Sequence, residues 1–176
     1  MTEWKKVYSL NHPADLGSGG FFEDLIEAQN KNADNETQDL FSVLYQLEHF
    51  RTCEGILHFK LCYPDLVDEF PFPCNEWTQL SNPLYDNVVQ GFKPINITFQ
   101  SAIKDFQGLS WTTRGVDSCL MEDFPYQRDS RAFCIGSLNG VDGKAVGPPK
   151  YSVEQVELFV NPGKEKTYSN MLMNQL

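Results

Sequence analysis

Apolar and polar residues alternate along several stretches of this 176-residue chain, as they do in strands with one buried face. The clearest stretch is 56–63 (ILHFKLCY), which ends where Pro64 and an acidic run begin. Its apolar residues of one parity are expected to face the core: Leu57, Phe59, Leu61 and Tyr63. Further strands are predicted over 4–10, 91–99, 106–113, 132–137 and 151–160.

Two stretches show helical spacing instead. In 39–51 (DLFSVLYQLEHFR) an apolar stripe recurs at the i, i+3, i+4, i+7 positions of an amphipathic helix. Residues 21–28 (FFEDLIEA) predict a second, shorter helix. The polar stretch 30–38 predicts an exposed loop, and 118–129 predicts an irregular polar segment.

The stretch 70–84 (FPFPCNEWTQLSNPL) interrupts the strand pattern with three prolines, a tryptophan and several amides. Proline removes a backbone donor and fixes φ, so a regular ladder is not expected here. We expect an irregular loop at the rim of the fold, close to whatever the protein binds.

The whole pattern predicts a mainly β fold with one or two short helices. Antiparallel strands with one buried face favour a β-sandwich, of the jelly-roll or galactose-binding-like kind. We expect one domain over 1–163, followed by a polar C-terminal tail over 164–176.

The formal net charge of −10 argues against a nucleic-acid or anionic-membrane surface, because phosphate binding depends on Lys and Arg. No apolar run approaches the length of a membrane-spanning helix, so no membrane span is expected. The chain opens MTEWKK with no apolar segment behind the lysines. It is therefore expected to be cytoplasmic, or secreted with its signal removed.

Five cysteines are an odd number, which leaves at least one unpaired in a monomer. They form no CxxC pair and no zinc spacing, so we expect free thiols in a reducing compartment. In an oxidising compartment Cys62 and Cys74 would close a loop. Sequons for N-glycosylation occur at 35–37 (NET) and 96–98 (NIT), and they matter only if the chain is secreted.

Several ordered motifs resemble a recurrent domain of marine invertebrates that occurs alone and beside lectin-like or fibrinogen-like modules. The most specific matches are 46–51 (QLEHFR) and 75–83 (NEWTQLSNP), with WKKVY near the start and VEQVELFV at 153–160. The chain departs from the family's pattern at 119–123 and 146–149, so no function located there is carried over. The resemblance implies a domain type and a lectin-like association, and it assigns no activity to any residue.

The 70–84 stretch supplies the first candidate ligand site. Sugar recognition needs planar hydrogen-bonding groups and an aromatic face, and amides, a carboxylate and a tryptophan lie within eight residues here. The candidate residues are Asn75, Glu76, Trp77, Gln79 and Asn82. The alternative is structural: the tryptophan belongs to the core and the amides satisfy an irregular loop.

Trp111 and Arg114 form a second candidate ligand pair near the end of a predicted strand, where a solvated surface pair is the alternative. Acidic side chains are weak candidates for calcium: Asp65, Asp68 and Asp142. None of them has EF-hand spacing. The sequence therefore establishes no cofactor, and calcium is the one for which it offers candidate ligands.

These observations predict a lectin-like module that binds a glycan or other polar ligand through loops at one end of a β-sandwich. Two alternatives stay open: a small enzyme or small-molecule-binding protein with an aromatic-lined pocket between the sheets, and a structural protein-interaction domain. No nucleophile elbow or phosphate-binding loop is encoded, and no catalytic residue is assigned. The oligomeric state is not predicted.

Overall fold

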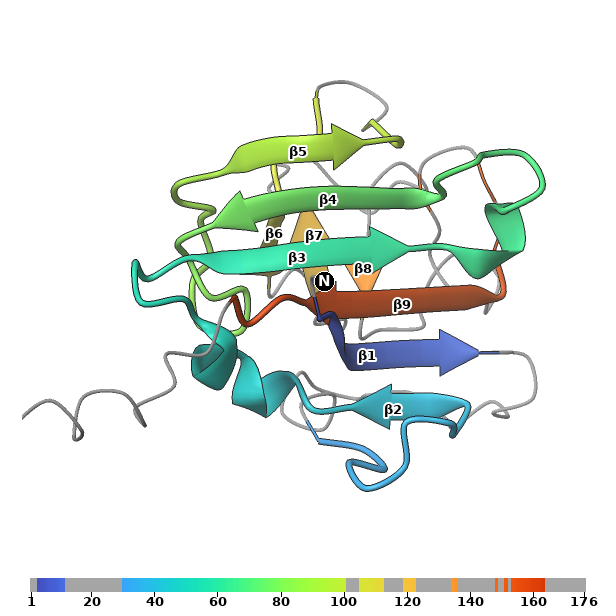
Figure 1. Cartoon of the computed structure of the whole chain (residues 1–176), viewed down its shortest axis with the longest axis horizontal. Coiled ribbons are helices and arrows are strands. Elements are labelled where there is room, and N and C mark those ends of the chain that lie inside the picture. Colours follow the sequence, from blue (N-terminus) through green and yellow to red (C-terminus); the bar gives the residue numbers. More distant parts are fainter. Residues whose placement is uncertain are drawn as a thin grey trace, which may run out of the picture.

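The structure is a computed structural model in which residues 3–11, 30–100, 105–112, 119–122, 134–135, 148, 151 and 153–163 are described. The fold is mainly β, as predicted, and its centre is a six-stranded antiparallel sheet with the order β2-β1-β9-β3-β4-β5 (Figure 1). In that order the strands are Leu40–Ser42, Lys5–Asn11, Gln155–Val160, Leu57–Cys62, Cys74–Gln79 and Lys93–Ile97.

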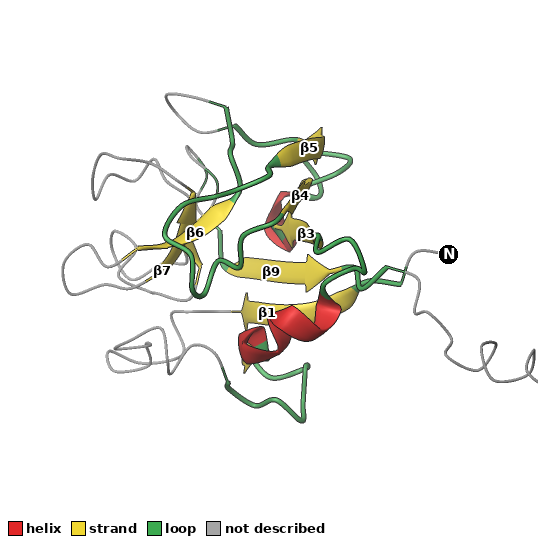
Figure 2. Cartoon of the chain, turned by 90° about the vertical axis from the view of Figure 1, so that its left-hand side faces the viewer, coloured by secondary structure: helices red, strands yellow, loops and turns green. Residues whose placement is uncertain are grey.

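A second, smaller sheet has the order β6-β7-β8. Its strands are Leu109–Thr112, Cys119–Glu122 and Cys134–Ile135. Both views place it on one side of the large sheet (Figures 1 and 2). Segment 105–109 joins the core there, because the ring centroids of Phe106 and Trp77 are 4.9 Å apart. Whether the two sheets complete a jelly-roll sandwich stays a prediction.

One face of the large sheet, called the inner face, carries the hydrophobic core. The parity predicted for β3 is confirmed, since Leu57, Phe59, Leu61 and Tyr63 are fully buried. In β9 the buried residues are likewise Val156, Leu158 and Val160. At the centre Phe59 stacks on Trp77 with ring centroids 5.4 Å apart. The opposite side of the sheet is called the outer face.

The predicted helix over 39–51 is wrong in both extent and type. Its first residues form β2, which pairs with β1 through Tyr8–Ser42 and Leu10–Leu40. The rest is a 3₁₀ helix, η2, over Leu44–Phe50. The apolar stripe is still used, because 3₁₀ geometry also aligns residues three apart and Leu44 and Leu47 are fully buried.

The predicted loop over 70–84 is wrong over its middle part, which forms β4. This strand pairs with β3 from Cys62–Cys74 to Leu57–Gln79. Its inward positions are Asn75, Trp77 and Gln79, so two of the three inward side chains are polar. An apolar–polar alternation was therefore absent, although the strand is regular. The segment predicted to be irregular over 118–129 likewise contains a strand, β7.

Cys62 and Cys74 occupy directly opposite positions on β3 and β4 and form a disulfide. The expectation of free thiols is wrong for these two residues. Cys53 is a free and exposed thiol. The bond closes the β3–β4 connection, which contains the short 3₁₀ helix η3 over Pro64–Leu66.

β5 is an edge strand with weak burial. A register shift between Glu76 and Trp77 on β4 leaves Ile95 unpaired, and its side chain is exposed. Pro94 suits an edge, where one side of the strand needs no ladder donor.

Two predicted segments, the helix over 21–28 and the tail over 164–176, lie outside the described residues. In the part of the chain that is described, no helix is long and apolar enough to cross a membrane.

Candidate functional site

Trp77, the aromatic residue of the predicted sugar site, is fully buried at the centre of the core. It lies between Phe59 and Phe106, and its indole Nε1 donates a hydrogen bond to Gln79 Oε1 at 2.8 Å. A sugar ring needs a free aromatic face to stack on. This indole offers none, so its role is the structural one.

Asn75 replaces part of a strand ladder with its side chain. Its Nδ2 donates to the carbonyl oxygen of Phe99 at 2.8 Å, and its Oδ1 accepts the Phe99 backbone N–H at 2.8 Å. Both groups of the buried amide are therefore bonded to the backbone of a single residue. The contact ties the chain beyond β5 back onto β4.

Gln79 does the same for the segment that leads into β6. Its Oε1 accepts the Leu109 backbone N–H at 3.2 Å as well as the indole proton, and its Nε2 donates to the carbonyl oxygens of Leu109 and Ser81 at 3.0 and 2.9 Å. The backbone comes this close because residue 108 is glycine: a Cβ there would lie 2.7 Å from Gln79 Oε1, and its φ is +90°. The amide has no capacity left for a ligand.

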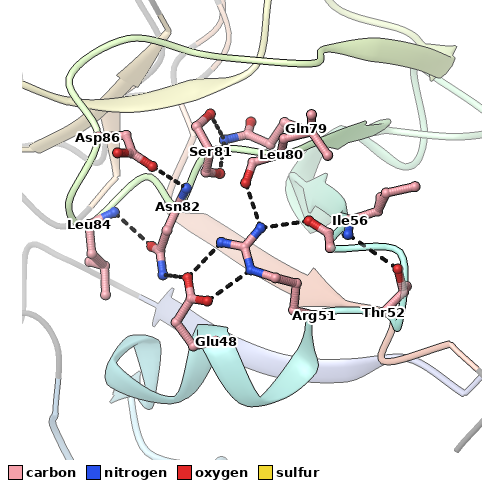
Figure 3. A network of polar contacts seen from close by, with 11 residues as sticks. Glu48, Arg51, Thr52, Ile56, Gln79, Leu80, Ser81, Asn82, Leu84 and Asp86 are labelled. Atoms are coloured by element: carbon pink, nitrogen blue, oxygen red, sulfur yellow. Dashed lines mark hydrogen bonds and ion pairs between the residues drawn. The ribbon is translucent and has the colours of Figure 1, made fainter.

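Asn82 joins a second network, drawn in Figure 3. Its Nδ2 donates to Glu48 Oε1 at 2.6 Å, and its Oδ1 accepts the Leu84 backbone N–H at 3.0 Å. The Glu48 carboxylate in turn accepts two hydrogen bonds from Arg51, one from Nε at 2.8 Å and one from Nη2 at 2.6 Å. Arg51 Nη1 also donates to the carbonyl oxygens of Gly55 and Leu80. The two motifs at 46–51 and 75–83 thus meet in space.

Electrostatics in this network follow from the short contacts. The Arg51 hydrogen bond holds the pKa of the Glu48 carboxyl below its ordinary value, although partial desolvation opposes the shift, and Asn82 adds to the lowering. The same pair raises the pKa of the Arg51 guanidinium. The network therefore joins η2 to the 80–86 turn through the Glu48–Arg51 ion pair and the Asn82 amide, which we call the Glu48 clamp.

The remaining predicted residues are not brought together with these. Trp111 lies in β6, with its side chain outside what is described, and Arg114 and Asp142 fall outside the described residues altogether. Asp65 and Asp68 are exposed, and an Asp65 carboxylate oxygen accepts the backbone N–H of Glu154. Within the described ranges no three His, Cys, Asp or Glu side chains group to hold a metal ion. Calcium stays a prediction.

Glu76 differs from the other predicted residues because it lies on the outer face. The strand register places it in a row that runs across β1, β9, β3 and β4: Lys6, Phe159, Lys60 and Glu76. Cross-strand neighbours of this kind point to the same side of a sheet and lie within contact distance. The four side chains are half-buried.

Trp4 and His58 extend this row toward the start of β3. The ring centroids of Trp4 and His58 are 4.8 Å apart, and His58 Nε2 lies 2.8 Å from Glu76 Oε1. Lys60 Nζ lies 4.4 Å from the Trp4 ring centroid and 4.9 Å from that of Phe159. We call these residues the outer-face cluster: Trp4, Lys6, His58, Lys60, Glu76, Glu157 and Phe159.

Charge in the outer-face cluster is locally balanced. Lys6 Nζ pairs with Glu157 Oε1 at 2.7 Å. Desolvation lowers the pKa of the Lys60 ammonium, while the nearby charges of Glu76 and Glu157 act in the opposite direction. A partly desolvated cation between two rings makes cation–π contacts that are stronger than those of a fully solvated lysine.

The sequence analysis did not identify this cluster, apart from Glu76. The signal was present in the outward positions of β3 and β9, where histidine, lysine, glutamate and phenylalanine alternate with the core residues. Joining them required the register of strands about 100 residues apart, which alternation alone cannot supply. The order and register of the strands therefore bring these residues together.

Replacing Gln79 by alanine should leave the Trp77 indole N–H and both backbone groups of Leu109 without this partner. Each buried group left unbonded costs about 1–3 kcal/mol, so the loss of three partners should lower the free energy of unfolding by roughly 3 kcal/mol or more. Urea unfolding measures it. Gln90→Ala, at an exposed position, is the matched control and should change little. Equal effects of the two substitutions would contradict the structural role of Gln79.

The Glu48 clamp predicts a pH dependence. Because the folded state lowers the pKa of Glu48, the stabilisation is present at neutral pH and is lost as the pH falls through that lowered pKa. Glu48→Gln should therefore cost about 1 kcal/mol or less at pH 7, since the pair is partly solvated, and progressively less in acid. Urea unfolding at pH 7 and in acid tests this, with Glu69→Gln as the control. A cost that grows in acid would contradict it.

Comparison with known proteins assigns no identity to the chain. No protein-family model matches it, and no curated protein or solved structure matches it. The resemblance to a marine-invertebrate domain thus stays a prediction, and function must be argued from the geometry of the site.

Proposed function

We propose that this chain is a lectin-like binding module that takes a neutral glycan, or a similar polyhydroxylated ligand, on the outer-face cluster. The observation that carries the proposal is the row of Lys6, Phe159, Lys60 and Glu76 across four adjacent strands. It sets aromatic rings beside hydrogen-bonding groups on a regular and rigid part of the fold. Rigid elements position a binding site more precisely than loops do.

The chemistry of the cluster suits a sugar. The Trp4 and Phe159 rings provide apolar surfaces for the C–H side of a pyranose, and Glu76 and His58 provide an acceptor and a second polar partner for hydroxyl groups. Lys60 now lies against both rings. Its flexible stem lets the ammonium move aside and donate to a bound hydroxyl.

The balanced charge favours a neutral ligand over a polyanion. Lys6 is matched by Glu157, and Lys60 lies near two carboxylates, so neither cation is available without a competing negative charge. The whole chain carries a net charge of −10, which repels polyanions at longer range. A polyol carries no net charge, and its hydroxyl groups can hydrogen-bond both to the lysine ammonium groups and to the carboxylates.

A second candidate function rests on exposed apolar side chains. Leu80, Tyr85 and Val88 are between 47% and 63% exposed within one short segment that follows β4. Grouped apolar residues of this kind favour the alternative of a protein-interaction domain. The two functions depend on different residues, so one experiment with variants of each set can separate them.

Titration with a panel of neutral oligosaccharides, followed by calorimetry, tests the proposed function. Trp4→Ala should weaken the binding of a responding sugar about tenfold or more, which corresponds to about 1.4 kcal/mol. Tyr85→Ala removes an exposed aromatic ring elsewhere and is the matched control, with no expected loss. Binding that survives Trp4→Ala and fails in Tyr85→Ala would transfer the site to the 80–88 segment. The absence of binding to any sugar would count against the glycan.

A further inference from the structure

The sequon at 35–37 has a defined local geometry. Asn35 Oδ1 accepts the backbone N–H of Thr37 at 3.1 Å and the Thr37 hydroxyl at 2.6 Å. This is an Asx turn closed by a second hydrogen bond from the hydroxyl. Both residues are exposed in the loop that precedes β2, and among the described contacts the Asn35 amide nitrogen has no acceptor. The turn involves three consecutive residues only, so an unfolded chain can form it too.

We infer that Asn35 is an N-glycosylation site and that the protein matures in an oxidising secretory compartment. The Thr37 hydroxyl polarises the Asn35 carboxamide through its oxygen, and this arrangement presents the nitrogen for reaction. The co-reactant is an oligosaccharide linked to a lipid diphosphate. Asn35 Nδ2 forms a bond to the anomeric carbon, and the bond from that carbon to the diphosphate oxygen breaks. The lipid diphosphate leaves with the electron pair of that bond, and one proton of the amide nitrogen passes to solvent.

The disulfide is an independent observation that points to the same compartment. Cys62 and Cys74 are bonded across β3 and β4. Disulfides form and persist where the environment is oxidising and are rare in the cytosol. The compartment that forms this bond also contains the glycosylation machinery in eukaryotic cells. A cytoplasmic location would leave both features unexplained.

The second sequon, at 96–98, has a different geometry. Asn96 is exposed on β5, but the Thr98 hydroxyl donates to the carbonyl oxygen of Phe72 at 2.7 Å and not to the asparagine. Asn96 therefore lacks the Asx turn, closed by the threonine hydroxyl, that Asn35 forms. This difference makes Asn35 the site to which we assign the glycan.

The position of Asn35 suggests what a glycan would do. The 30–39 loop lies along β2, the last strand at one side of the large sheet (Figure 1). Lys31 forms a β-bridge with Ser42, and Asn32 Nδ2 donates to the carbonyl oxygen of Leu40 at 2.7 Å. The loop itself therefore covers the outward side of β2, the side on which an exposed edge strand would pair with another chain. A glycan on Asn35 would stand on this covering loop and leave the outer-face cluster on the central strands accessible.

Site-specific mass spectrometry of the protein from the tissue that makes it tests the inference. Trypsin places Asn35 in peptide 32–51 and Asn96 in peptide 61–104, so the two sequons are read separately. Glycosidase treatment in heavy-oxygen water should convert Asn35 to labelled aspartate. Thiol alkylation without reduction should leave Cys62 and Cys74 unlabelled. An unmodified Asn35 overturns the inference, and so does alkylation of both cysteines.

Variants expressed behind a secretion leader in eukaryotic cells test the role of the turn. Asn35→Gln and Thr37→Ala should each lose the glycan of peptide 32–51, whereas Thr37→Ser keeps a hydroxyl and should retain it. Asn96→Gln is the control and should retain it too. An Asn35 glycan that persists in Thr37→Ala would contradict the role of the hydroxyl, and one that is missing from the unaltered chain would overturn the assignment.

Discussion

Two buried amides on β4 hold this fold together. Asn75 and Gln79 face the core, where an unbonded polar group is costly, and each uses its carboxamide to pair with both backbone groups of a distant residue. The first contact attaches Phe99 and the second attaches Leu109, which begins the smaller sheet. These side-chain hydrogen bonds therefore replace backbone pairing where the strand ladder stops. They also explain why Trp77 can be buried whole, since its N–H has a partner in Gln79.

Much of this architecture follows from the sequence, and the exceptions share a cause. The β3 and β9 patterns were readable because their inward residues are apolar, as at Phe59 and Leu158. β4 was missed because amides occupy two of its inward positions, so polarity no longer marks the solvent side. The 39–51 stripe was read as an α-helix because spacing alone does not distinguish it from a strand followed by a 3₁₀ turn. In each case tertiary pairing decided the local structure.

The candidate site was predicted in composition but not in position. Residues expected to bind a sugar at a loop are structural, apart from Glu76. The outer-face cluster instead comes from four strands and from Trp4, which directly precedes β1. The central strands β1, β9, β3 and β4 carry the outer-face cluster, while the two sequons lie beside β2 and on β5, toward the edges of the sheet.

The central claim is that the amide and indole groups of β4 are turned inward and saturated. Hydrogen exchange of the tryptophan indole protons, followed by NMR, tests it most directly. The Trp77 indole N–H should exchange only when the core opens, far more slowly than that of the half-buried Trp4. Exchange of Trp77 as fast as Trp4 would contradict the account and would return the 75–82 stretch to the surface as a binding site.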